Sequence, residues 1–193
     1  MSVNELPLVL LCHPATPAPV VRSVEARAER TASGDLALAY RLRGDMVRLR
    51  IPPPTAPQRA ECLWEHSCFE AFIAIAGDPA YHEFNFSPSG EWASYAFAGY
   101  RQPAAVTTPL PAPRLTATLS AGRLELEVLI AAAALPPNAA AARLQVGLAA
   151  VVEAADVVDG GHSYWALHHP ASLPDFHHRD SFRLELDPAA DSA

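Results

Sequence analysis

The chain has 193 residues, 14 basic against 21 acidic side chains, a formal net charge of −7, and an apolar half. That length fits one domain of ordinary size, and the apolar content excludes an intrinsically disordered chain. All fourteen basic residues are arginine, which rules out a Walker A phosphate loop, a pyridoxal Schiff base and a lysine general base. A net acidic chain without a basic cluster also predicts no nucleic-acid partner, because phosphate contacts supply most of that affinity.

Cysteine content and hydropathy predict a reducing compartment and no membrane. The three cysteines, Cys12, Cys62 and Cys68, form no CxxC pair, which fits free thiols better than a disulfide scaffold. The apolar run at residues 6–11 is broken by Pro7 and is too short for a secretory signal. No segment reaches the roughly 20 apolar residues that span a bilayer. We therefore expect a cytoplasmic location.

Proline clusters and alternating apolar positions predict short strands along the chain. The 19 prolines argue against long helices. Alternation predicts strands at residues 20–30, 36–42, 46–51, 115–119, 124–130, 144–152 and 182–186. The second and third of these should form a hairpin that turns at Gly44-Asp45, and the fourth and fifth one that turns at Ala121-Gly122. One short helix is expected within residues 136–143.

Many short strands with turn signals about every ten residues are typical of an all-β fold, an antiparallel β-sandwich. No internal repeat is visible, and no linker divides the chain. Residues 1–193 are therefore expected to form a single domain.

Aromatic residues concentrate in a predicted three-stranded meander. Ten of the fifteen aromatics lie in residues 64–100, within or beside the segments 67–76, 80–86 and 91–98. We expect Phe72 opposite Asn85, and Asn85 opposite Trp92, so that one sheet face is apolar. The other face then gathers Glu70, Phe72, Tyr81, Glu83, Asn85, Trp92 and Ser94. Carboxylates beside aromatic rings suit a sugar or another small polar ligand, although a solvated sheet face shows the same alternation.

Three motifs in this part of the chain and beyond it resemble a known family. They are LWEHSCFEAF at residues 63–72, YHEFNFSPSGEW at 81–92, and SYWALHHP at 163–170 followed by PDFH at 174–177. These motifs resemble the bacterial DOMON-like domains, which are related to the family 9 carbohydrate-binding modules, over roughly residues 60–187. The resemblance implies a jelly-roll-like β-sandwich with a pocket for sugar or haem on one sheet.

The resemblance also implies a ligand site. The sugar-binding modules clamp a saccharide between two tryptophans, and Trp92 with either Trp165 or Trp64 would serve here. Together with the meander, the expected ligand-binding residues are Trp64, Glu70, Phe72, Tyr81, Glu83, Asn85, Trp92 and Trp165.

Histidines offer an alternative class, a haem- or metal-binding protein. Haem-binding relatives use a methionine and a histidine as axial ligands, but Met46 stands beside a predicted turn, which leaves a bis-histidine arrangement. Five of the eight histidines lie in residues 162–178, and His168, His169 and His177 near Asp175 have ligand types suited to zinc. No defined ligand spacing accompanies them.

Catalytic alternatives fit the spacing poorly. His66, Cys68 and Glu70 alternate on one strand face, about 6–7 Å apart, too far for a nucleophilic dyad. In the predicted register Glu70 and Glu83 are about 13 Å apart, beyond the separation of a glycosidase pair. We therefore expect a non-catalytic module without a cofactor, whose partner is a sugar-like small molecule; its oligomeric state is left open.

Overall fold

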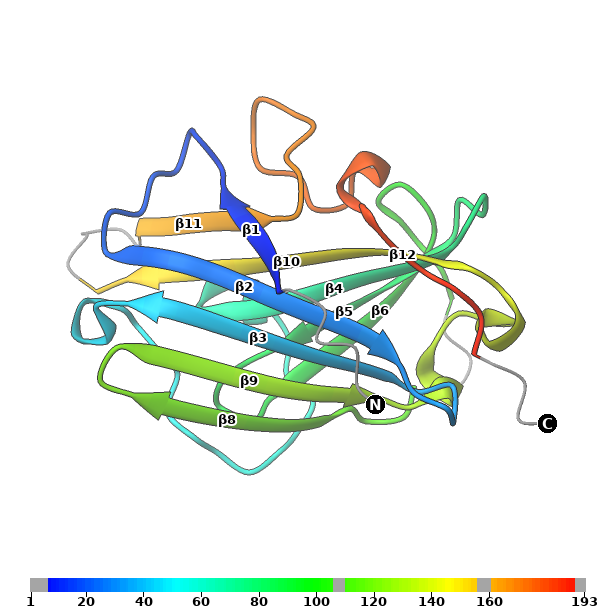
Figure 1. Cartoon of the computed structure of the whole chain (residues 1–193), viewed down its shortest axis with the longest axis horizontal. Helices are drawn as coiled ribbons and strands as arrows, with labels where there is room; N and C mark the ends of the chain where they lie inside the picture. Colours follow the sequence, from blue (N-terminus) through cyan, green and yellow to red (C-terminus); the bar gives the residue numbers. More distant parts are fainter. Residues whose placement is uncertain (1–6, 106–109, 156–160, 190–193) are drawn as a thin grey trace.

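Antiparallel strands make up almost all the regular structure of a computed structural model, which describes residues 7–105, 110–155 and 161–189 (Figure 1). The strands are β1 (Leu8–Cys12), β2 (Val21–Arg30), β3 (Leu36–Gly44), β4 (Cys68–Ile75), β5 (Tyr81–Phe86), β6 (Trp92–Gly99), β7 (Gln102–Pro103), β8 (Arg114–Ser120), β9 (Arg123–Ile130), β10 (Leu144–Ala154), β11 (Gly161–Ala166) and β12 (Leu184–Leu186). Helical structure in the described residues is confined to the 3-10 turns η1 (Met46–Arg48), η2 (Leu63–Glu65), η3 (Ala132–Ala134), η4 (Ala139–Ala141) and η5 (Arg179–Ser181). None of these turns is long and apolar enough to cross a membrane.

The strands form two layers that are joined through β1. The first layer runs in the order β1-β2-β3-β9-β8, and the second in the order β7-β6-β5-β4-β10-β11 with β12 beside β10. β1 pairs with β2 on one edge and with β11 on the other, so it belongs to both layers. In Figure 1 the strands β2, β3, β9 and β8 lie in front of β4, β5 and β6. The predicted all-β sandwich is confirmed.

The main core fills the space between the layers. Alternate residues of β3 and β9 face alternate residues of β4 and β5, and the buried side chains form one apolar cluster. Tyr40 of β3 packs on Phe69 of β4 with ring centroids 4.9 Å apart. Its hydroxyl donates a 2.9 Å hydrogen bond to the carbonyl oxygen of Glu70, which ties the two layers together.

A second apolar cluster lies on the outer face of the second layer. It includes Phe72 of β4, Tyr81 of β5, and Phe176 and Phe182 from the segment between β11 and β12. Both faces of β4 are therefore buried, which agrees with its nearly continuous apolar sequence, CFEAFIAI. Glu70 is the only charged residue in β4, and its side chain lies on the same outer face as this second cluster.

One predicted strand is wrong, and the predicted short helix is a single 3-10 turn. Residues 46–51 do not form a strand, because the Asp45 side chain accepts a hydrogen bond from the Val47 amide and starts the turn η1. β3 pairs instead with β2 and β9. The expected helix within 136–143 is only the 3-10 turn η4, since Asn138 has a left-handed conformation with φ 66°. Arg30 binds the Ala139 carbonyl oxygen at 2.7 Å, which occupies an acceptor that a longer helix would use.

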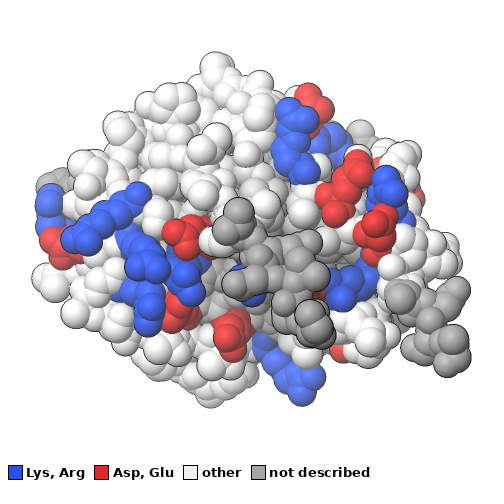
Figure 2. All heavy atoms as spheres, in the orientation of Figure 1, with Lys and Arg blue, Asp and Glu red and all other residues white. Residues whose placement is uncertain are grey.

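Charges on the exposed face of the first layer are mixed in sign. Figure 2 shows acidic and basic side chains interspersed over this side of the molecule. Arg41 contacts Glu125 at 2.8 Å and Glu25 at 3.6 Å across neighbouring strands. Such exposed pairs contribute little to stability, and they leave no single-sign surface in this view.

Candidate functional site

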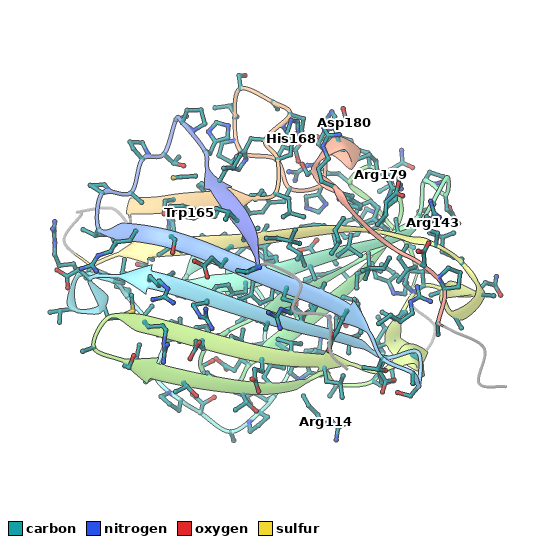
Figure 3. The ribbon with its side chains drawn as sticks, in the orientation of Figure 1. Arg114, Arg143, Trp165, His168, Arg179 and Asp180 are labelled. Carbon is teal, nitrogen blue, oxygen red and sulfur yellow. The ribbon has the colours of Figure 1, made fainter. Side chains whose placement is uncertain are left out.

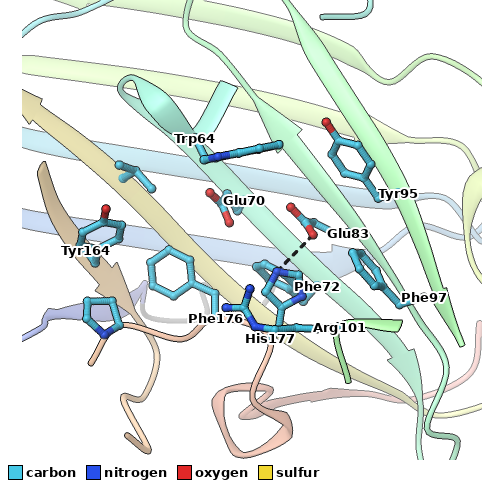
Figure 4. A pocket seen from close by; sticks show the side chains of 12 residues that line it. Trp64, Glu70, Phe72, Glu83, Tyr95, Phe97, Arg101, Tyr164, Phe176 and His177 are labelled. Atoms are coloured by element: carbon cyan, nitrogen blue, oxygen red, sulfur yellow. Dashed lines mark ion pairs between the residues drawn. The ribbon is translucent and has the colours of Figure 1, made fainter. Parts of the chain in front are cut away.

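A cavity of about 440 Å³ opens on the outer face of the second layer (Figure 4). Strands β4, β5 and β6 form its floor, η2 forms one wall, and the segment between β11 and β12 forms the opposite wall. The lining residues are Trp64, Glu70, Phe72, Glu83, Tyr95, Phe97, Arg101, Val151, Tyr164, Pro174, Phe176 and His177. This size is within the usual range for small-molecule sites. We call this cavity the carboxyl pocket, after Glu70 and Glu83.

Strand register brings the two carboxyl groups together. Glu70 pairs with Asn85, and Phe72 pairs with Glu83, so Glu70 and Glu83 are diagonal neighbours on one face. Diagonal neighbours in an antiparallel pair are about 7–8 Å apart at the backbone. The predicted separation of about 13 Å is therefore wrong, and distance alone does not exclude a paired-carboxylate site.

Loop length explains why the predicted register failed. The last pair between β4 and β5 is Ala74 with Tyr81, which leaves residues 75–80 as the loop, two residues more than expected. The last pair between β5 and β6 is Phe86 with Trp92, so this loop gains one residue, Glu91. A shift of one residue exchanges the faces of a strand.

That exchange moves Trp92 out of the predicted site. Trp92 pairs with Phe86 and shares its face, which packs toward the first layer. Tyr95 and Phe97 take its place, and both line the carboxyl pocket. Ser94 lies opposite Phe84, again on the face away from the pocket.

The predicted tryptophan clamp is not formed either. Trp165 is buried in the core between the layers, where its indole Nε1 donates a 2.9 Å hydrogen bond to Ser163. Figure 3 shows it among the strands, with His168 in the loop beyond β11. The neighbouring Tyr164 points to the opposite face and lines the pocket. Trp64 is thus the one tryptophan at the cavity, and this residue is 42% exposed.

Glu70 is a buried carboxyl group without a close cation. It is 3% exposed, and its Oε1 contacts the Cys68 thiol at 3.6 Å. Among the described residues no arginine or histidine forms an ion pair with it. Burial, followed by the charge of Glu83, raises the pKa of Glu70 to about 8. The Cys68 thiol has its pKa raised by burial and by Glu70, so it stays protonated and is a poor nucleophile.

Glu83 has two neutral neighbours, and one of them donates a hydrogen bond to it. Asn85 Nδ2 donates to its Oε1 at 3.0 Å, and His177 Nε2 lies 3.6 Å from its Oε2. Burial raises the pKa of Glu83 to about 7, although the Asn85 hydrogen bond and the Arg101 charge oppose that rise. Burial, followed by the charge of Arg101, lowers the pKa of His177 to about 4. The imidazole is therefore neutral near pH 7, and its contact with Glu83 is not an ion pair there.

A hydrogen-bond chain orients His177. The backbone N–H of Arg101 donates to the Tyr81 hydroxyl at 3.2 Å, and that hydroxyl lies 2.8 Å from His177 Nδ1. We assign the hydroxyl proton of Tyr81 to the bond with Nδ1 and the imidazole proton to Nε2, which faces Glu83, because this tautomer lets both ring nitrogens meet a suitable partner. Tyr81 itself lies behind the pocket wall, stacked on Phe97 with centroids 4.8 Å apart.

Arg101 brings a positive charge to the pocket, but an acidic neighbour engages it. Its Nη2 donates to Asp175 Oδ1 at 2.9 Å. The other oxygen of Asp175 accepts a 2.6 Å hydrogen bond from the Tyr100 hydroxyl. Arg101 and Asp175 therefore neutralise one another at the rim, and the two glutamates define the polarity of the floor.

The sequence-predicted residues divide into three groups. Trp64, Glu70, Phe72 and Glu83 line the pocket, whereas Tyr81 and Asn85 form hydrogen bonds with lining residues. Trp92 and Trp165 lie outside it. The sequence did not predict the other lining residues as ligand-binding; they are Tyr95, Phe97, Arg101, Val151, Tyr164, Pro174, Phe176 and His177, of which His177 was expected only as a metal ligand. Tyr95 and Phe97 do alternate in the sequence, but the wrong register assigned them to the other face.

The histidines of the alternative interpretation are dispersed. His177 lines the carboxyl pocket, while His169 Nε2 contacts the Leu11 carbonyl oxygen at 2.8 Å. His168 keeps a buried Nδ1 without a hydrogen-bond partner. Within residues 7–105, 110–155 and 161–189, no three histidine, cysteine, aspartate or glutamate side chains are grouped so that they could hold a metal ion.

The fold is similar to those of solved protein structures. No protein-family model matches the chain, and no curated protein sequence matches it. One similar structure is a protein from Bacteroides uniformis ATCC 8492 for which carbohydrate binding has been proposed, with a TM-score of 0.58 and 17% identity over 93% of this chain and 84% of that one. Another is a family 9 carbohydrate-binding module from Caldicellulosiruptor kristjanssonii in complex with glucose, with a TM-score of 0.56 and 9% identity over 90% and 79% of the two chains. The chain therefore shares the sandwich fold of these proteins.

Proposed function

We propose that the protein is a non-catalytic module that binds a sugar in the carboxyl pocket. One observation carries the proposal: the buried carboxyl groups of Glu70 and Glu83 and the exposed indole of Trp64 line the same cavity, which is large enough for a monosaccharide. The fold shared with a glucose-bound carbohydrate-binding module supports it. The motifs that resemble DOMON-like domains support it as well, since they contain Trp64, Glu70 and Glu83.

The chemistry of the pocket suits a sugar ring. Trp64 presents an apolar face at the pocket, and Tyr95 stands 6.0 Å from it, centroid to centroid, in an edge-on arrangement. A pyranose has apolar C–H faces and a polar hydroxyl edge, which match an aromatic wall and a polar floor. The oxygens of Glu70 and Glu83 would accept hydrogen bonds from the hydroxyls, and a protonated carboxyl group can donate one as well.

The arrangement of the carboxyl groups favours binding over hydrolysis. A glycosidase pair flanks the scissile bond, and in an inverting enzyme the two groups lie on opposite faces of the sugar. Glu70 and Glu83 project from neighbouring strands of one sheet face (Figure 4), and no other carboxyl group of the described residues lines the cavity. Turnover of an aryl glycoside by the wild-type protein, abolished in Glu70→Gln, would contradict the non-catalytic assignment.

Removal of the exposed indole tests the site directly. Trp64→Ala is expected to weaken monosaccharide binding about tenfold, the loss of about 1.4 kcal/mol of aromatic contact. The unfolding free energy should change by less than about 1 kcal/mol, because the side chain is 42% exposed. Isothermal titration calorimetry and urea unfolding measure the two effects.

The matched control is Leu119→Ala on β8, a similarly exposed apolar side chain on the other layer. It should leave sugar affinity unchanged. Equal affinity of Trp64→Ala and the wild-type protein would remove the indole from the binding site.

A further inference from the structure

The carboxyl pocket holds two acidic groups and no available cation of its own. Among the described residues, the carboxyl group of Glu70 has a hydrogen bond only from the Cys68 thiol, and that of Glu83 contacts an amide and a neutral imidazole. The positive group that lines the cavity, Arg101, is bound to Asp175 at 2.9 Å. With both glutamates ionised, the described part of this pocket carries an excess of negative charge.

That excess is more than a neutral sugar requires. Hydroxyl groups can be recognised by amides and backbone groups, which carry no charge. Ionising a buried carboxyl group without a cationic partner costs free energy, and this cost raises the pKa of the group. Two such groups on neighbouring strands, Glu70 at 3% and Glu83 at 6% exposure, repel one another as well. A ligand that carries a positive charge would offset both costs.

The walls of the pocket also suit a cation. Trp64, Tyr95 and Phe72 lie around the two carboxyl groups (Figure 4). A cation near the face of an aromatic ring is attracted by the ring quadrupole, more strongly when the site is partly desolvated. Aromatic rings that surround paired carboxyl groups form a favourable environment for an ammonium group.

We propose that the carboxyl pocket selects an amino sugar with a free, protonated amine, whose ammonium group lies between Glu70 and Glu83 while its ring packs on Trp64. This inference rests on the proposed sugar-binding function and specifies its ligand. An N-acetylated sugar lacks the charge, so it gains nothing from the second carboxyl group.

Binding of such a ligand should release protons. The titratable groups around the pair are Cys68, Tyr81, Tyr95, Arg101, Tyr164, Asp175 and His177. The pKa of Glu70 is raised to about 8 and that of Glu83 to about 7. Both groups are therefore largely protonated in the empty pocket at about pH 6.5. An ammonium group between them favours ionisation, and the displaced protons go to solvent.

Calorimetric titration of three sugars at about pH 6.5 tests the inference. D-glucosamine should bind at least about tenfold more tightly than D-glucose, because charge-assisted hydrogen bonds are stronger than neutral ones. N-acetyl-D-glucosamine should bind no better than D-glucose. Repeating the D-glucosamine titration in two buffers of different ionisation enthalpy should show release of between about one and two protons per site.

One glutamine variant and its control test whether Glu70 causes the preference for D-glucosamine over D-glucose. Glu70→Gln should reduce the ratio of the D-glucosamine and D-glucose affinities about tenfold, because it keeps the size of the side chain and removes its charge. Glu185→Gln on β12 removes the same formal charge at an exposed site that contacts Arg143, and it should keep the wild-type ratio. Melting temperature confirms that both variants are folded.

The outcomes separate the two proposals. If D-glucose binds as tightly as D-glucosamine, the amine inference is wrong and the sugar-binding function stands. If none of the three sugars binds, the sugar-binding function is wrong, and the inference falls with it. If Glu70→Gln retains the wild-type ratio, the carboxyl pair is not the source of the preference.

Discussion

Glu70→Gln is expected to stabilise the empty protein by about 2–4 kcal/mol at about pH 8. The pKa of Glu70 is raised from 4.5 to about 8, with burial as the larger cause and the charge of Glu83 as the smaller. Between these two values the unfolded chain has lost the proton and the folded protein retains it. The contribution of Glu70 to the stability of the wild-type protein should therefore be most favourable below about pH 4.5, and it should decrease as the pH rises to about 8.

The measurement is the free energy of unfolding in urea at several pH values between about 5 and 8. Glu70→Gln should flatten the decline, and Glu83→Gln should flatten it less, since the pKa of Glu83 is raised only to about 7. Glu185→Gln, in an exposed ion pair, serves as the control and should keep the wild-type slope. An unchanged slope in Glu70→Gln would show that this carboxyl group is solvated.

Phe72→Ala is expected to reduce the unfolding free energy by about 3–5 kcal/mol. Phe72 is 1% exposed, and its ring centroid lies 5.8 Å from that of Phe182 and 6.4 Å from that of Phe176. It also lies 5.2 Å from the ring of His177. Its loss leaves a void beneath the segment that forms one wall of the pocket.

Sugar affinity should decrease together with stability in this variant, because Phe176 and Phe182 of the pocket wall lose their packing contacts with Phe72. Urea unfolding and calorimetric titration measure the two effects. Phe72→Leu refills most of the volume and should recover most of the stability. A loss below about 1 kcal/mol in Phe72→Ala would mean that residues 176–182 do not pack on this face.

The strand pattern could be predicted from the sequence because alternation is a local property. Leu124, Leu126 and Val128 alternate with polar residues, and β9 has the expected place and partner. Residues 46–51 alternate as well, but the capping bond of Asp45 favours a turn there. Alternation alone cannot distinguish these two segments.

The composition of the pocket could be predicted in part. Glu70 and Phe72 alternate on β4, and Glu83 shares their face as expected because the register error between β4 and β5 was an even number of residues. The lengths of the loops after β4 and β5 could not be predicted from the sequence. The loop after β5 is one residue longer than expected, and this difference places Tyr95 instead of Trp92 on the pocket face. The wall formed by Phe176 and His177 depends on long-range packing, which no local pattern indicates.

The tryptophan indole signals in the nuclear magnetic resonance spectrum test the central claim most directly. The three tryptophans differ in place: Trp64 lines the carboxyl pocket, whereas Trp92 and Trp165 are buried elsewhere. On titration with D-glucosamine or D-glucose, the indole N–H signal of Trp64, assigned by its absence in Trp64→Phe, should shift with saturation. The signals of Trp92 and Trp165 should move little. A saturating shift confined to Trp92 or Trp165 would place the sugar elsewhere on the sandwich and contradict the carboxyl pocket as its site.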